Sequence, residues 1–116
     1  MSKKQPKDER IRLQHMLDSA QKAVNFAKNR PRQDLESDEM LSLALVRLLE
    51  IIGEAAKAVP QDIKNIYPDI AWRDIGRTRD RLIHGYYDVD LDIVWDIVTN
   101  DLPPLIQALI SDNLPG

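Results

Sequence analysis

Apolar residues recur at helical spacing along most of this chain. Within residues 8–29 they follow steps of three and four, which predicts a helix with one buried face: Leu13, Leu17, Ala20, Val24 and Ala27. His15 falls on the opposite side and is expected to be a solvated surface residue. The segment 29–34 contains Pro31 and should end the helix, because proline disfavours helical geometry in the residue before it.

A second helix is predicted from about Ser37 or Asp38 to Val59, where Pro60 ends it. Ser37 could cap it, with Asp38 and Glu39 favourably placed near the positive end of the helix dipole. The helix is apolar around most of its circumference, apart from a narrow polar stripe: Arg47, Glu50, Glu54 and Lys57. Such a helix is usually central to a bundle or also covers a partner subunit. Gly53 within it indicates close packing, since glycine costs about 1 kcal/mol relative to alanine.

A third helix should cover about Ala71 to His84, with Gly85 as its C-terminal stop. Asp88 or Asp90 could cap a fourth, whose apolar positions are Leu91, Val94, Val98, Leu102, Leu105 and Leu109. Pro103-Pro104 must kink or divide this last helix, because neither has a backbone donor. Tyr67 and Tyr87 are interpreted as packing residues. The prediction is an all-α, antiparallel bundle of four to five helices that forms a single domain over residues 1–116.

Composition narrows the possible chemistry. The 116 residues include no cysteine, which removes disulfides, thiolate nucleophiles and cysteine metal sites and fits a reducing cytoplasm. The basic N-terminus lacks the apolar core of a signal peptide, and no apolar run reaches the roughly 18 residues that span a bilayer. The net charge is −3, yet residues 71–85 carry +2, so the rest of the chain carries −5. A patch this small could hold one phosphate or a short strand, or dock an acidic partner.

The candidate chemistry lies in the pattern Arg-x4-His-x-Tyr formed by Arg79, His84 and Tyr86. A base that titrates near neutrality, a permanent cation and a phenol can carry out phosphoryl chemistry without a metal. Neither the histidines nor the scattered carboxylates have convincing metal-ligand spacing, so no metal or other cofactor is expected.

Helical spacing predicts where these side chains point. Positions 72, 75, 79, 82 and 86 share one face, which places Arg79 on an otherwise apolar stripe. An inward arginine indicates either an internal salt bridge, to Glu50 or Glu54, or a cleft that is dry until an anion enters. Both explanations remain open at this point.

A second stripe contains Arg73, Arg77, Arg81 and His84, and a charge run of this kind is more often a solvated face than a binding site. Asp80 lies four residues before His84 and could hold its imidazole. On an ideal helix Arg79 and His84 are about 140° apart. Either the helix end is distorted, or the site is completed between two subunits.

The chain resembles the HEPN superfamily of helical ribonucleases and, more closely, the HepT-like toxins of prokaryotic toxin–antitoxin pairs. The resemblance covers nearly the whole chain, through the segments 52–57, 72–75, 79–86, 89–95 and 101–103. Arg77-Thr78 stands where related sequences often have Gly-Met, a departure that could alter local packing or RNA contacts.

The resemblance implies a homodimeric, metal-independent endoribonuclease that acts on RNA. Arg79 and His84 match the family's catalytic arginine and histidine, and Asp80 matches the polar position after that arginine. Tyr86 matches the tyrosine to which a partner nucleotidyltransferase of the MNT type, the antitoxin, can add AMP. Two alternatives stay open: a non-catalytic dimer that binds a nucleotide, RNA or the transferase, and a purely structural dimer.

Overall fold

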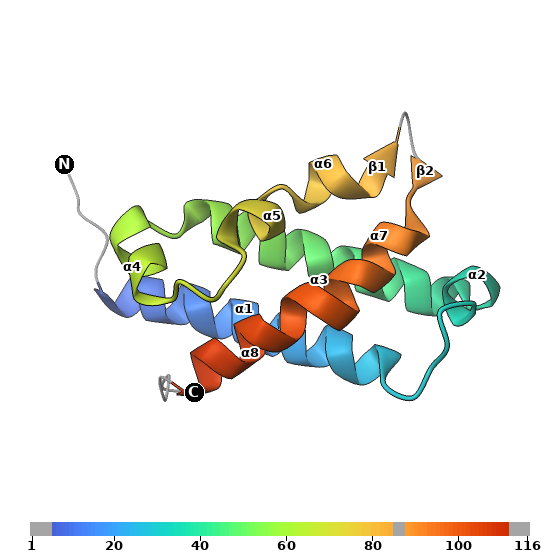
Figure 1. Cartoon of the computed structure of the whole chain (residues 1–116), viewed down its shortest axis with the longest axis horizontal. Coiled ribbons are helices and arrows are strands. Elements are labelled where there is room, and N and C mark those ends of the chain that lie inside the picture. Colours follow the sequence, from blue (N-terminus) through green and yellow to red (C-terminus); the bar gives the residue numbers. More distant parts are fainter. Residues whose placement is uncertain (1–5, 85–87, 112–116) are drawn as a thin grey trace.

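Two long antiparallel helices, α1 (Pro6–Ala27) and α3 (Glu39–Ala58), lie side by side and form the base of the bundle (Figure 1). The computed structural model describes residues 6–84 and 88–111. The stripe predicted for α1 is confirmed: four of its members are buried, and Val24 packs at the edge of the core. His15 is exposed, as expected.

Shorter elements complete the described chain: α2 (Asp34–Ser37), α4 (Gln61–Ile66), α5 (Trp72–Gly76), α6 (Thr78–Leu82), β1 (Ile83–His84), β2 (Asp88–Val89), α7 (Leu91–Asp96), the π-helical turn η1 (Ile97–Asp101) and α8 (Leu102–Ser111). The all-α prediction is confirmed, because the two strands form only a two-residue antiparallel ladder. None of the described helices is both long enough and apolar enough to cross a membrane.

Asp38 caps α3, so the expectation that Ser37 would do so is wrong. The Asp38 carboxylate accepts a hydrogen bond from the Leu41 amide at 3.1 Å, whereas Ser37 is the last residue of α2. Asp38 also accepts a hydrogen bond from the Arg30 guanidinium at 2.9 Å, and Arg30 bonds Asp34 at 2.6 Å. An aspartate accepts a hydrogen bond from a free amide at the start of a helix as well as a serine does. Only the aspartate can also form an ion pair with the arginine. The start of α3 is therefore tied to the loop after α1.

The last helix continues through Pro103-Pro104 and is not divided there. Asp90 caps it by accepting from the amides of Asp92 and Ile93. Helices α7, η1 and α8 then form one path, in which α7 lies against α3 and α8 lies against α1 (Figure 1). In η1 the Leu102 amide donates to the Ile97 carbonyl, five residues back. This π turn widens the backbone just before the two prolines, which cannot donate to the preceding turn.

The predicted helix over 71–84 is instead two short helices followed by a strand. Helix α5 ends at Gly76, and Arg77 at the junction has φ −96° and ψ 17°. Helix α6 then runs only to Leu82, after which Ile83 pairs with Val89 in the β-ladder. The predicted stop at Gly85 lies outside the described residues.

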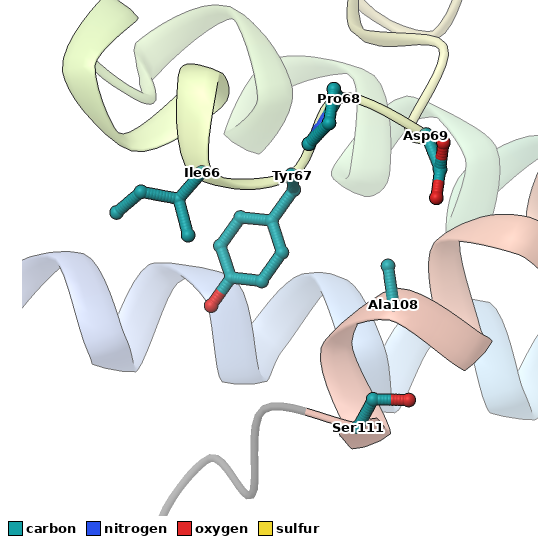
Figure 2. A pocket seen from close by; sticks show the side chains of 6 residues that line it. All are labelled: Ile66, Tyr67, Pro68, Asp69, Ala108 and Ser111. Atoms are coloured by element: carbon teal, nitrogen blue, oxygen red, sulfur yellow. The ribbon is translucent and has the colours of Figure 1, made fainter.

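Tyr67 is a packing residue, as predicted, and Tyr87 lies outside the described residues. The side chain of Tyr67, which follows α4, is buried, and its carbonyl accepts from the Trp72 indole at 3.0 Å. Beside it is a hollow of about 220 Å³, lined by Ile66, Tyr67, Pro68, Asp69, Ala108 and Ser111 (Figure 2). Arg79, the motif residue whose side chain the structure describes, does not line this hollow.

At Gly53, α3 closely approaches the α5–α6 junction. A Cβ at this position would lie 3.0 Å from the Ile75 carbonyl oxygen and 3.1 Å from the Thr78 Cβ. The close packing expected of Gly53 is therefore confirmed, and its neighbours are identified. A hydrogen atom in place of a methyl group lets the α5–α6 backbone rest directly on α3.

We expect Gly53→Ala to lower the free energy of unfolding by up to about 2 kcal/mol, because the added methyl group overpacks this contact at a cost of about 1–3 kcal/mol. The gain in helix propensity, about 1 kcal/mol, would offset only part of that loss. Gly76→Ala is the matched control, because a Cβ there would meet only the Lys57 Cγ at an ordinary 3.5 Å. Urea unfolding of both variants measures the difference. Equal stability of the two variants would contradict this account of Gly53.

We also expect Asp38 to make stability depend on pH in acid. Hydrogen bonding from Arg30, and then from the Leu41 amide, lowers the pKa of Asp38 below its ordinary value of 3.8. The stabilisation from this carboxylate is thus fully present above the ordinary pKa and is lost as pH falls through the lowered one. Urea unfolding at a series of pH values, from neutral into acid, measures the effect. The free energy of unfolding should fall less steeply with acid in Asp38→Asn and Arg30→Gln than in the wild type. If the free energy of unfolding falls with acid in both variants as it does in the wild type, the Asp38 carboxylate does not cause the pH dependence.

Candidate functional site

An open groove of about 460 Å³ lies where α3 and α6 meet, and it contains part of the Arg-x4-His-x-Tyr motif. Its lining residues are Glu54 and Lys57 of α3 and Arg79 and Asp80 of α6. Two cations and two carboxylates therefore face one space. Guanidinium and ammonium groups can bind phosphate oxygens, and carboxylates can accept hydrogen bonds from hydroxyl and amino groups.

Arg79 points to solvent, so the prediction that it lies on the inward stripe is wrong. Its side chain is exposed, and it forms no ion pair with Glu50 or Glu54, the two partners expected from the sequence. Glu50 instead faces Arg47 at 3.6 Å, and Glu54 faces Lys57 at 4.0 Å. The internal salt bridge is therefore excluded, and a cation open to an incoming anion remains.

Thr78 takes the inward position that was assigned to Arg79. Positions 78 and 79 lie three and four residues after buried Ile75, so helical spacing permits either to face the core. Thr78 is 1% exposed, and its hydroxyl donates to the Ile75 carbonyl at 2.5 Å. A small side chain with its hydroxyl satisfied costs far less to bury beside Gly53 than an unpaired guanidinium. Burial of Thr78 therefore turns Arg79 and Asp80 outward.

The structure describes only the backbone of His84, and Tyr86 lies outside the described residues. The His84 backbone is extended and pairs with Asp88 in the β-ladder. The suggested contact between Asp80 and the His84 imidazole stays a prediction. Asp80 itself is exposed at the groove.

The end of α6 at Leu82 removes one argument for a two-chain site. The separation of about 140° between Arg79 and His84 assumed a regular helix through both residues. The chain leaves the helix between them, so the distorted helix end is the alternative that the structure supports. A dimer therefore has to be supported on other grounds.

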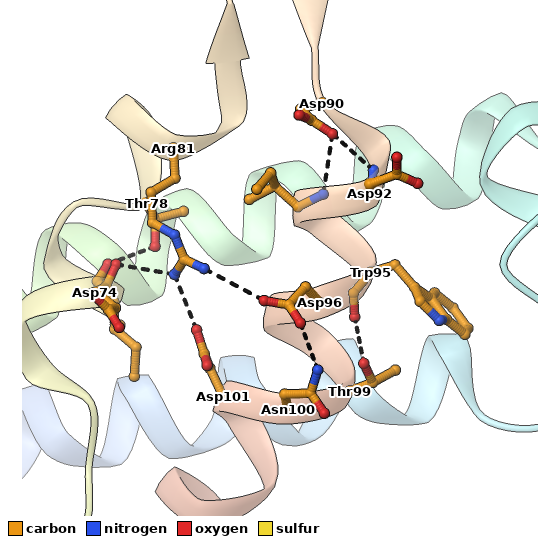
Figure 3. A network of polar contacts seen from close by, with 12 residues as sticks. Asp74, Thr78, Arg81, Asp90, Asp92, Trp95, Asp96, Thr99, Asn100 and Asp101 are labelled. Atoms are coloured by element: carbon orange, nitrogen blue, oxygen red, sulfur yellow. Dashed lines mark hydrogen bonds and ion pairs between the residues drawn. The ribbon is translucent and has the colours of Figure 1, made fainter.

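The predicted outer stripe is only partly solvated. Arg73 and Arg77 are exposed, as expected of a solvated face. Arg81 is different, because its side chain is only 21% exposed and pairs with Asp96 and Asp101 of the last helix (Figure 3). Three arginines of the segment remain open to a ligand, and one is a structural cation.

Sequence reasoning did not assign Lys57 to the site, and it considered Glu54 only as a possible salt-bridge partner of Arg79. Both had been placed on the polar stripe of the second helix, and only the packing of α6 against α3 brings them to Arg79. The one available signal was Gly53, because a glycine that marks a close approach also indicates which helix turn lies beside the neighbour. In the described part of the chain, no group of three or more histidines and carboxylates could hold a metal ion.

Comparison with known proteins places this chain in a family. Residues 16–111 match the family described as ribonuclease HepT-like. A probable ribonuclease HepT of Thermococcus cleftensis is 38% identical over 93 residues, covering 80% of this chain and 84% of that protein. A Methanocaldococcus jannaschii protein assigned as an RNase is 37% identical, over 89% of this chain and 85% of its own. Another such protein, from Caldanaerobacter subterraneus subsp. tengcongensis, is 34% identical over 80% of this chain and 83% of its own. No solved structure showed a significant match.

Proposed function

Because the chain belongs to the HepT-like ribonuclease family, we propose that it is an endoribonuclease that cleaves RNA at the groove between α3 and α6. The observation that carries the proposal is the exposure of Arg79 in this groove, without an ion pair to a described carboxylate. A buried, paired arginine would be a structural residue. An open one beside Lys57 can receive a phosphodiester.

The proposed reaction begins with attack of a ribose 2′-hydroxyl on the adjacent phosphorus. His84 removes the hydroxyl proton as the new O–P bond forms. The bond to the 5′-oxygen breaks, and a general acid protonates that leaving oxygen. Arg79 stabilises the charge that develops on the non-bridging phosphate oxygens, a role that suits a planar and permanently charged donor. The products carry a 2′,3′-cyclic phosphate, or a 3′-phosphate after hydrolysis, and no metal takes part.

The other groove residues suit the binding of a nucleotide. The stem of Lys57 lies against Gly76, and its side chain lines the groove together with Arg79. Lys57 would hold a neighbouring phosphate as a point charge. Glu54 and Asp80 would accept hydrogen bonds from ribose or base, and Asp80 would also orient His84.

We further propose that the protein acts as a homodimer in a toxin–antitoxin module. A two-fold axis near the motif would bring two copies of His84 into one cleft, so that one copy accepts a proton and the other donates one. The exposed apolar side chains of Met40 and Leu43 on α3 are compatible with an interface. The antitoxin would be an MNT-type nucleotidyltransferase that adds AMP to Tyr86, beside the catalytic residues in sequence.

Arg79→Ala and His84→Ala should each reduce cleavage of single-stranded RNA by the purified protein by about 10²- to 10⁴-fold. The assay contains a chelator, and the product ends are identified by mass spectrometry. Arg10→Ala, which removes an exposed arginine of α1, is the matched control and should retain activity. A 2′-deoxy substrate should resist, because it lacks the nucleophile. Unchanged cleavage by either motif variant would refute the catalytic assignment and favour the non-catalytic binding module.

Incubation with ATP, magnesium and a nucleotidyltransferase encoded beside this protein should add the mass of one AMP, located on Tyr86 by peptide mass spectrometry. The phenol would displace pyrophosphate from ATP, forming one O–P bond as another breaks. Tyr86→Phe should stay unmodified, whereas Tyr67→Phe should still gain the mass. If the Tyr86→Phe protein were still modified, Tyr86 would not be the acceptor of AMP.

A further inference from the structure

Arg81 links the helix that carries Arg79 to the π turn of the last helix. Its Nη1 atom donates to the Asp101 carboxylate at 3.0 Å and to the Asp74 carbonyl at 3.3 Å (Figure 3). Its Nη2 atom lies 3.6 Å from the Asp96 carboxylate. The Arg81 and Asp101 side chains are only 21% and 17% exposed. One guanidinium thus joins α5, α6 and both ends of the π turn.

The π turn is what allows both aspartates to reach the same arginine. Asp96 and Asp101 are five residues apart, and in a regular α-helix such residues point about 140° away from each other. In η1 the backbone hydrogen bond spans five residues, so residues i and i+5 come to lie on successive turns of the same face. Asn100 donates to Asp96 at 2.5 Å and holds that carboxylate toward α6.

Helix α6 needs such an anchor because it is too short to hold its own orientation. It has five residues, and only Thr78 and Leu82 are buried. Isolated helices shorter than about 12 residues are marginal in water, so packing and ion pairs must fix it. The Arg81 guanidinium, which faces three acceptors, restricts rotation of the helix about its axis. Packing through Thr78 and Leu82 alone would resist that rotation less.

We propose that Arg81 is a positioning residue for the cleavage reaction, and that Asp96, Asp101 and the π turn form its clamp. The clamp fixes the orientation of α6 and so places Arg79, two residues earlier, in the groove. Arg81 does not bind RNA itself, because both terminal nitrogens already face protein oxygens. This inference rests on the proposed ribonuclease function for its kinetic consequence, but not for its structural one.

The test compares two aspartates, each of which pairs with an arginine that also faces a second carboxylate. Asp101→Asn removes the stronger carboxylate of the Arg81 clamp and keeps its shape. Asp34→Asn is the matched control, because Arg30 is likewise shared by two carboxylates, Asp34 at 2.6 Å and Asp38 at 2.9 Å. Both variants are compared with the wild type by melting temperature, by hydrogen exchange of the amides in residues 78–82, and by steady-state RNA cleavage.

Asp101→Asn should speed hydrogen exchange across residues 78–82 and lower kcat by roughly 10- to 100-fold, with a smaller change in KM. Asp34→Asn should leave both readouts near the wild-type values, even if its melting temperature falls as far. Arg81→Lys, which keeps the charge but loses the fork, should give an intermediate kcat.

Equal effects of Asp101→Asn and Asp34→Asn on kcat would overturn the proposal, because general stability would then explain the loss. Unchanged exchange over residues 78–82 in Asp101→Asn would also overturn it, whatever the activity. If the wild type cleaves no RNA while Asp101→Asn still loosens α6, the ribonuclease function fails and the clamp stands.

Discussion

The contact between Gly53 and the α5–α6 junction is the constraint on which the rest of the site depends. The α3 backbone comes close enough that a Cβ would meet the Ile75 carbonyl at 3.0 Å. Only a small side chain fits beside it, and Thr78 fills that place with its hydroxyl satisfied. Once Thr78 is inward, the next two residues must face outward. The groove therefore follows from a packing contact that involves none of the reacting groups.

A second constraint acts from the opposite side of α6. The Arg81 guanidinium binds the last helix at the π turn, and this turn immediately precedes the two prolines. Two features that are usually costly in a helix, a proline pair and an irregular turn, thus coincide with the point where the site helix is held. Gly53 and Arg81 fix α6 by different means, one through close packing and one through charge.

Most of the bundle could be predicted from local pattern. The buried stripe of α1, the glycine contact of α3 and an aspartate cap for the last helix, at Asp88 or Asp90, all follow from spacing or residue type within a few positions. The cap at Asp38 was misassigned to Ser37, because the choice depends on Arg30, which lies outside the helix. The strand after Leu82 was missed for a similar reason: its partner, Val89, lies beyond a turn, and a helical pattern within 71–84 gave no signal of it.

The site was predictable in its chemistry and not in its geometry. The motif identified Arg79, but helical spacing alone could not decide whether residue 78 or 79 faced the core, and the packing against Gly53 decided it. Lys57 and Glu54 come from another helix, so no local pattern connects them with Arg79. The role of Arg81 required the π turn, since regular helical geometry would separate Asp96 from Asp101. In each case the missing information was a contact between segments distant in sequence.

The central claim is that burial of Thr78 against Gly53 turns Arg79 into the groove, and thiol labelling tests it most directly. The chain has no cysteine, so Thr78→Cys and Arg79→Cys each introduce a single reactive group. The labelling rate of each variant is measured under native conditions, relative to its rate in denaturant. We expect the thiol at position 79 to react at nearly its unfolded rate and the thiol at position 78 to be strongly protected. Protection at 79 with free reaction at 78 would contradict the account.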